Sequence, residues 1–325
     1  MAKTRYAPDR GLTARMTLTM FLLGLVFVAF ITVLVLILGA TGRVSNGGIV
    51  FFAVLLGLAL CVGSFFYSDK IALSAAQAQL VTPQDGPQAA RLHGIVDRLC
   101  ALANMPKPRL AIAPSPMLNA FATGRNQKTA VLVVTTGLLN NPDLNDSELE
   151  AVLAHELSHV AHKDVAVMTI ASFLGIIAGL LVRFAFYSEL FGGGGRGRGG
   201  NNNNGGALPV ILIVLVVGMV TYAISFLLIR LLSRYRELAA DRSGALLTGQ
   251  PSALASALQK VSGSMTRIPT KDLRSAEPLN AFYFVPAFKA GGKEVSLNSI
   301  FSTHPTLERR LRQLAEISEQ LSKQG

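Results

Sequence analysis

Four long apolar runs constrain the fold of this 325-residue chain more than any other feature. They cover residues 16–40, 48–67, 165–186 and 207–229. Each is close to the roughly 20 residues that a helix needs to cross a bilayer. The first run is longer than the apolar core of a signal peptide, about 7–15 residues, so we interpret it as a retained anchor. We therefore expect a mainly α-helical integral membrane protein with four transmembrane helices.

The composition outside the runs is that of a soluble domain, although the whole chain is 50% hydrophobic and only 15% charged. We expect one soluble domain assembled from two segments, 69–164 and 230–325, that flank the second membrane hairpin. The remaining parts are an N-terminal segment (1–15), a first hairpin (16–68) and a second hairpin (165–229). Residues 187–206 of the second hairpin are rich in Gly and Asn and predict a flexible loop.

The net charge of +11 is compatible with nucleic-acid binding or with a cytoplasmic excess of Lys and Arg beside membrane spans. The second interpretation is favoured, because the basic residues gather at span ends on one predicted side. They are Arg5, Arg10, Arg15, Lys70, Arg230, Arg234 and Arg236, whereas the opposite loops hold Arg43, Arg196 and Arg198. The positive-inside rule then makes both termini and both soluble segments cytoplasmic. We expect no nucleic-acid partner.

A metal-binding pattern lies at the end of the first soluble segment, in His155-Glu156-Leu157-Ser158-His159. Two imidazoles four residues apart share one helical face, which lets both bind one zinc ion. Glu156, beside the first ligand, is then placed to take a proton from the attacking water. Asn145 and Glu148 predict a capping box at the start of this helix.

A third ligand is expected from the second soluble segment, because catalytic zinc sites with two histidines commonly add a carboxylate. Glu237 and Asp241 are four residues apart and share a helical face. Glu237 is the candidate ligand, and Asp241 is the candidate acceptor for the free ring N–H of a zinc-bound histidine. The alternative is a solvated helix in which Glu237 pairs with Arg234 or Arg236.

His162 competes for the third position, since it continues the pattern three residues after His159. On one continuous helix it lies about 10 Å along the axis from His155, too far for both to bind one ion. We interpret His162 as a helix-end residue. The expected cofactor is thus one Zn²⁺ per subunit, held by His155, His159 and Glu237.

The first soluble segment also predicts an α+β arrangement that is mostly helical. Helices are expected over 71–80 and 88–104, and strands over 109–113 and 130–135. Residues 114–125 contain two prolines and a glycine and predict turns. The glycine-lysine stretch at 291–294 lacks the upstream Gly and the Ser or Thr of a P-loop, so we expect no nucleotide partner and no dependence on ATP.

Four motifs together resemble the HtpX-type proteases. They are the 155–159 pattern between membrane runs, Glu237-Leu238-Ala239-Ala240-Asp241 after another run, Asn119-Ala120-Phe121-Ala122-Thr123-Gly124, and Thr303-His304-Pro305. The resemblance implies a gluzincin-like zinc endopeptidase of the bacterial inner membrane, related to the CAAX prenyl proteases. It further implies cleavage of misfolded or membrane proteins at the cytoplasmic face, in quality control and the stress response.

Two further site residues depend on this resemblance. Asn119 would begin an edge along which a substrate peptide lies extended, although an ordinary turn residue would look the same. His304 could stabilise an oxyanion on the substrate, or it could be structural, before a helix capped at Thr306. The alternatives to the enzyme as a whole are a non-enzymatic membrane scaffold and a prenyl-protein-type protease.

Overall fold

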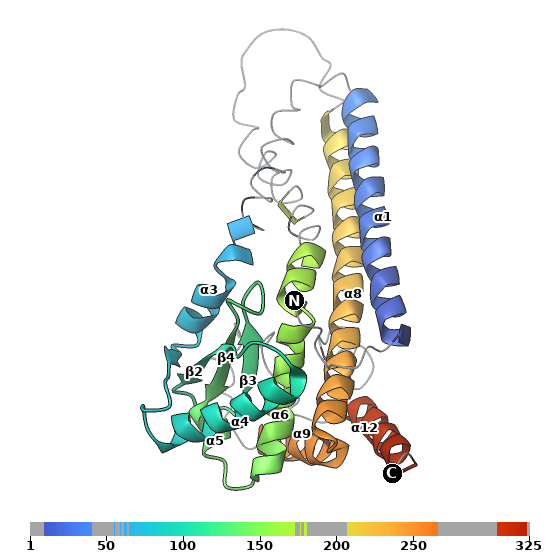
Figure 1. The fold of residues 1–325 in the computed structure, drawn as a ribbon. Helices are drawn as coiled ribbons and strands as arrows, with labels where there is room; N and C mark the ends of the chain where they lie inside the picture. Colours follow the sequence, from blue (N-terminus) through green and yellow to red (C-terminus); the bar gives the residue numbers. More distant parts are fainter. Residues whose placement is uncertain are drawn as a thin grey trace. The chain divides into compact units, whose positions relative to one another are not determined.

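The computed structural model describes residues 10–40, 65–172, 207–265 and 304–323, with seven isolated residues at 55, 59, 62, 63, 176, 179 and 180. The described part is mostly helical (Figure 1). The helices are α1 (Arg10–Ala40), α3 (Ser68–Ala75), α4 (Pro87–Ala103), α5 (Thr136–Leu139), α6 (Asp146–Ala161), α8 (Ala207–Thr248), α9 (Pro251–Met265) and α12 (Leu307–Ser322). The chain divides into two compact units: residues 1–16, 64–167 and 233–325 form the first, and residues 17–63 and 168–232 the second.

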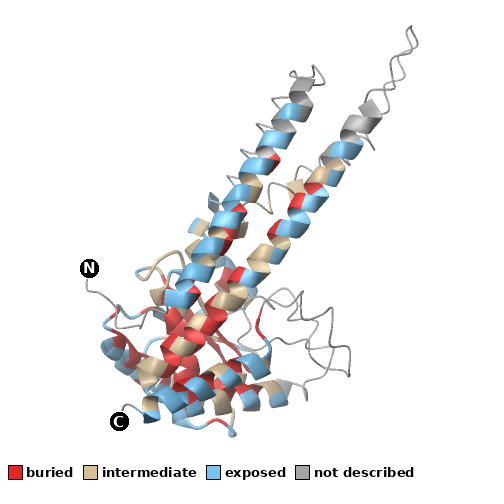
Figure 2. Ribbon diagram, turned by 90° about the vertical axis from the view of Figure 1, so that its right-hand side faces the viewer, coloured by how far each residue is buried: buried red, intermediate tan, exposed pale blue. Residues whose placement is uncertain are grey.

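Two of the described helices are long and apolar enough to cross a membrane, over Arg10–Phe30 and Leu215–Thr248. Figure 2 shows that α1 and the first part of α8 are exposed over much of their length. The exposed side chains include Phe21, Leu25, Val216 and Met219, which are more than half exposed. Large apolar side chains in this number on a helix surface are suited to lipid rather than to water.

Most of the predicted span 48–67 lies outside the described residues, as do about half of the predicted span 165–186, which is described over 165–172, and the whole predicted loop 187–206. The predicted span 207–229 belongs to α8, which continues without a break to Thr248. One helix of 42 residues therefore carries both a candidate span and the segment with the predicted third ligand.

A four-stranded sheet organises the first unit, with the strand order β1-β2-β4-β3. The strands are β1 (Gln79–Leu80), β2 (Arg109–Ala113), β3 (Ala120–Thr123) and β4 (Val131–Thr135). β2 and β4 run parallel, with Arg109 opposite Val131, while β1 and β3 are antiparallel to their neighbours. β3 occupies one edge of the sheet and has β4 as its partner.

The sheet corrects two sequence expectations. The predicted helix over 71–80 ends at Ala75, because Gln77 adopts a left-handed backbone (φ 51°) and the chain turns into β1. The predicted turns over 114–125 contain β3, whose register places Phe121 opposite Val133. By contrast, the expected strand over 109–113 and the helix over 88–104 are confirmed within a residue.

Alternating side chains of the central strands supply two hydrophobic layers. Leu132 and Val134 of β4 face a large core shared with α4, α6, α9 and α12. Val131 and Val133 face a smaller core made with small alanines of β2 and α3. Both faces of β4 are thus covered, which is why its sequence is apolar without alternation. The larger core positions α6, the helix that carries the histidines.

Candidate metal centre

The N-terminus of α6 is fixed by a capping box. The Asn145 side chain accepts from the Glu148 N–H, and the Glu148 carboxylate accepts from the Asn145 N–H, each at 2.9 Å. The predicted cap is therefore confirmed. Glu148 is also buried and accepts hydrogen bonds from Ser256 and Lys260 of α9, at 2.5 and 2.6 Å. These contacts tie the start of the histidine helix to α9.

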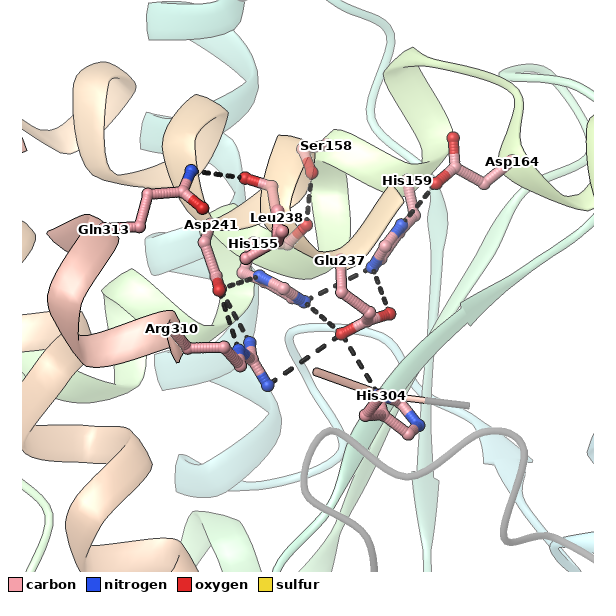
Figure 3. A network of polar contacts seen from close by, with 10 residues as sticks. All are labelled: His155, Ser158, His159, Asp164, Glu237, Leu238, Asp241, His304, Arg310 and Gln313. Atoms are coloured by element: carbon pink, nitrogen blue, oxygen red, sulfur yellow. Dashed lines mark hydrogen bonds and ion pairs between the residues drawn. The ribbon is translucent and has the colours of Figure 1, made fainter. Parts of the chain in front are cut away.

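Three ligand atoms converge at the other end of α6. Atoms of His155, His159 and Glu237 lie within 4.8 Å of one another. The Nε2 atoms of the two histidines are 3.3 Å apart, and each is 3.6 Å from a carboxylate oxygen of Glu237. The structure thus brings together the three residues that the sequence proposed as ligands (Figure 3).

His162 is not a member of this group. It is the C-cap residue of α6, where the helix ends, as the sequence predicted. Its neighbour Lys163 has a left-handed backbone (φ 59°), so α6 does not continue straight into the helical residues that follow.

Each of the two histidines faces a carboxylate with its outer nitrogen. Nδ1 of His155 is 2.9 Å from Asp241 Oδ1, and Nδ1 of His159 is 2.6 Å from Asp164 Oδ2. Because Nδ1–H donates to a carboxylate, the lone pair of Nε2 is left to point at the centre of the group. Figure 3 shows both rings held in this way, with their Nε2 atoms turned towards Glu237.

A buried arginine from the C-terminal helix completes the arrangement around Asp241. Arg310 of α12 donates to both oxygens of Asp241 at 2.7 and 2.6 Å, and it lies 3.9 Å from Glu237 Oε2. Arg310 and Asp241 are 2% and 0% exposed, so this is a desolvated pair with full charge on both partners. Arg310 thus holds the carboxylate of Asp241, which orients His155.

The donor set fits a divalent metal such as zinc. Zinc bonds of about 2.0–2.1 Å in a tetrahedron place neighbouring ligand atoms about 3.3–3.5 Å apart, close to the 3.3 and 3.6 Å seen here. Burial acts to lower the pKa of His155, but the carboxylates of Asp241 and Glu237 outweigh it and raise that pKa to about 9. Burial lowers the pKa of His159 to about 4, which keeps its imidazole neutral, as a ligand must be. The carboxylates of Asp241 and Glu237 therefore favour positive charge beside His155.

Gly244 allows α8 to approach α6 closely enough to bring Glu237 to the histidines. A Cβ atom at this position would lie 2.9 Å from the backbone nitrogen of His155 and 3.1 Å from its Cα. Real Cβ atoms essentially never come that close to another atom, so the helices could not approach in this way with a larger residue at 244. The spacing of the ligand-bearing helices therefore depends on the missing side chain.

Glu156 lies beside the first histidine in the buried part of α6 and is 4% exposed. Burial raises the pKa of its carboxyl above the usual value, and the neighbouring imidazole of His155 opposes the shift. A raised pKa brings a carboxylate closer to the range in which it can both accept and return a proton near neutral pH.

The two residues suggested by the family resemblance occupy different places. Nδ1 of His304 is 3.2 Å from Glu237 Oε2, and His304 is buried directly before α12, whose predicted cap at Thr306 is observed. Asn119 is buried directly before β3, where its N–H donates to the Thr135 hydroxyl at 3.0 Å. The structure thus brings His304 to the His-Glu group and uses the backbone of Asn119 to anchor the edge strand.

Comparisons with known proteins bear on this site. The model of Peptidase family M48 matches residues 87–318, which include the histidine helix, Glu237 and Arg310. Protease HtpX homolog 1 of Streptomyces coelicolor is 53% identical over 319 residues, covering 98% of this chain and 97% of that protein. Protease HtpX homolog of Moorella thermoacetica is 48% identical, with 96% of each chain covered. The crystal structure of S. mikatae Ste24p aligns with a TM-score of 0.47 and 21% identity, over 94% of this chain and 66% of that one.

The chain belongs to peptidase family M48. The resemblance to HtpX-type proteases is therefore confirmed. With its His-His-Glu group and its apolar helices, this M48 peptidase is a membrane-bound metalloprotease.

Sequence reasoning missed two polar residues around the centre of this M48 peptidase, Asp164 and Arg310. Asp164 stands five residues after His159, a spacing that does not place two residues on one helical face. Arg310 stands 69 residues after Asp241 in a helix with several other charges. Arg310 could have been sought from the sequence, because a carboxylate such as Asp241, if buried, needs a cationic partner in addition to one histidine.

Proposed function

We propose that this M48 peptidase is a zinc endopeptidase with one zinc per subunit. His155 and His159 would hold the ion through Nε2, and Glu237 would hold it through its carboxylate. The observation that carries the proposal is the convergence of these three ligand atoms within 4.8 Å, with a carboxylate behind each imidazole. Asp241 would fix the tautomer and orientation of His155.

The proposed reaction is hydrolysis of a peptide bond. When bound, zinc lowers the pKa of water and polarises the carbonyl group of the substrate. Glu156 takes a proton from the attacking water and passes it to the amine of the leaving segment. The buried position of Glu156 favours this role. Glu156 must carry the proton between the two steps, and burial makes this protonated form easier to reach by disfavouring the charged one. His304, which lies beside Glu237, is the candidate group to stabilise the negative charge on the substrate oxygen.

The proposed substrate is an extended polypeptide that adds to the edge of the sheet. β3 lies at the end of the strand order and contacts α6, the histidine helix. An edge strand offers unpaired backbone groups to a peptide, which gives affinity without strong sequence preference. Such binding suits misfolded or membrane proteins, and Asn119, at the start of β3, would be a contact at one end.

We place the enzyme in the bacterial inner membrane with four spans, over 16–40, 48–67, 165–186 and 207–229. The gluzincin-like α+β domain, formed by 69–164 and 230–325, would be cytoplasmic together with both termini. The distribution of Lys and Arg supports this orientation. The reaction would need no nucleotide and no nucleic acid. A non-enzymatic scaffold is not favoured, because such a protein would need no buried carboxylate beside the first ligand.

Metal analysis of single variants tests the ligand set. The full-length protein, purified in detergent, is expected to contain one zinc, and His155→Ala, His159→Ala and Glu237→Ala are each expected to lose it. His162→Ala is the matched control, since this histidine ends α6 outside the group. Retention of zinc by all three ligand variants, or its loss from His162→Ala alone, would refute the assignment.

A further inference from the structure

Asp164 contacts the second of the two histidines and lies outside the four motifs described above. Its Oδ2 lies 2.6 Å from Nδ1 of His159, and Asp164 is only 8% exposed. The other oxygen forms an ion pair with Arg236 of α8, which is also buried. A buried carboxylate with an imidazole on one side and a guanidinium on the other has full compensation for its charge.

The position of Asp164 depends on a break in the helix. In an unbroken α-helix a residue five positions after His159 would be about 140° around the axis from it. Here Lys163 takes a left-handed backbone conformation with φ 59°, which a non-glycine residue rarely adopts. The Lys163 N–H donates to Val160 O, and the Lys163 carbonyl accepts from the Val167 N–H, so one helix ends and the next begins at this residue. The turn brings Asp164 back to His159.

The arrangement parallels the one around His155. There Asp241 faces Nδ1 and Arg310 neutralises Asp241, whereas here Asp164 faces Nδ1 and Arg236 neutralises Asp164. Two of these four residues, Arg236 and Asp241, stand on α8 on either side of Glu237. α8 therefore provides one ligand and one member of each supporting pair.

We propose that Asp164, held by Arg236, is the positioning residue of His159, and that the left-handed turn at Lys163 is what places it there. The inference rests on the proposed zinc site. Asp164 would accept the Nδ1–H, fix the tautomer that leaves Nε2 as the ligand atom, and increase the donor strength of the imidazole. A carboxylate of this kind affects metal affinity by about 10–100-fold when it is removed.

The test measures zinc affinity by chelator competition on the full-length protein in detergent, together with the visible spectrum of the cobalt-substituted protein. Asp164→Asn is expected to bind zinc about 10–100-fold more weakly and to shift the cobalt spectrum, which a purely structural residue would leave unchanged. The control is Asp143→Asn, an exposed acid in the turn before α6. It should match the wild type in both measurements.

A second pair of variants acts through the backbone alone, because the Lys163 side chain is exposed. Lys163→Gly accepts the left-handed conformation and should keep wild-type affinity, whereas the β-branched Lys163→Val opposes it and should weaken zinc binding. If circular dichroism shows that Asp164→Asn is unfolded, the comparison of Lys163→Gly with Lys163→Val tests the inference instead. Equal affinity and equal cobalt spectra in Asp164→Asn and the wild type would overturn the inference, as would equal affinity in Lys163→Gly and Lys163→Val. Absence of zinc binding in the wild type would instead refute the proposed zinc site itself.

Discussion

Replacement of Gly244 by alanine should disturb the metal centre without changing any polar group. The added Cβ would lie 2.9 Å from the nitrogen of His155, whereas ordinary contact begins at 3.4 Å. The two backbones must therefore move apart by about 0.5 Å, because neither neighbour is a flexible side-chain end. Glu237 stands two turns earlier on the same helix, so its carboxylate should move with the backbone.

Two effects of this displacement can be estimated. Overpacking of a buried contact costs about 1–3 kcal/mol of folding free energy. A displacement of about 1 Å in a catalytic site lowers the rate about 100-fold, so a displacement of about 0.5 Å should lower kcat/KM about tenfold. The assay is cleavage of an unfolded protein at several substrate concentrations, with zinc content and thermal unfolding measured on the same preparation.

The matched control is Gly94→Ala on α4, where an added Cβ would meet nothing within 4 Å. That variant should keep wild-type activity and gain up to about 1 kcal/mol from the better helix propensity of alanine. Wild-type kcat/KM and zinc content in Gly244→Ala would refute the reasoning, since the helices could then separate without consequence for the ligands.

Two further predictions concern buried polar contacts, and a third concerns the proposed metal. Glu148→Gln should destabilise the fold by about 1–3 kcal/mol at neutral pH. Burial acts to raise the pKa of Glu148, but hydrogen bonds from Lys260 and Ser256 outweigh it and lower that pKa. Its stabilisation is therefore complete above the unfolded-state pKa and is lost as pH falls through the lower folded-state value, so the two unfolding curves should converge in acid. Arg310→Met should cost about 3–5 kcal/mol, because it leaves Asp241 buried without its cation, and Arg310→Lys should recover part of this in a denaturant titration. Removal of metal by a chelator should abolish cleavage and raise sensitivity to heat, and added zinc should restore both.

The sequence was most informative where local chemistry decides the structure. The capping box of Asn145 and Glu148 appears as predicted, because both partners are three residues apart and need no distant contact. The expected end of the histidine helix at His162 is also observed. The pairing of Glu237 and Asp241 with the histidines could be anticipated from ligand chemistry, although the two segments are about 80 residues apart.

The expectations failed where distant contacts override local preference. β3 contains Ala120 and Ala122, which have low preference for strands, and it follows two prolines. It forms a strand because β4 supplies hydrogen bonds and Phe121 enters the smaller core. The helix expected over 71–80 stops at Ala75, because the chain must turn at Gln77 to pair β1 with β2.

The role of Asp164 could not be predicted for a different reason. Its contact with His159 needs a left-handed backbone conformation at residue 163. Gly or Asn at this position would have indicated that conformation, but lysine does not. From the sequence, Arg236 was expected to be a basic residue at a span end or an exposed partner for Glu237, whereas the structure pairs it with Asp164. Both misses concern buried charges whose partners are set by the packing of α8.

The most direct test of the account compares the wild type with Glu156→Gln, purified in detergent, for zinc content and for cleavage of an unfolded protein. The substitution removes the carboxylate and leaves the two histidines and Glu237 in place. We expect both proteins to bind one zinc and only the wild type to cleave the substrate. Equal cleavage by both would contradict the role of Glu156, and absence of zinc from both would contradict the metal centre itself.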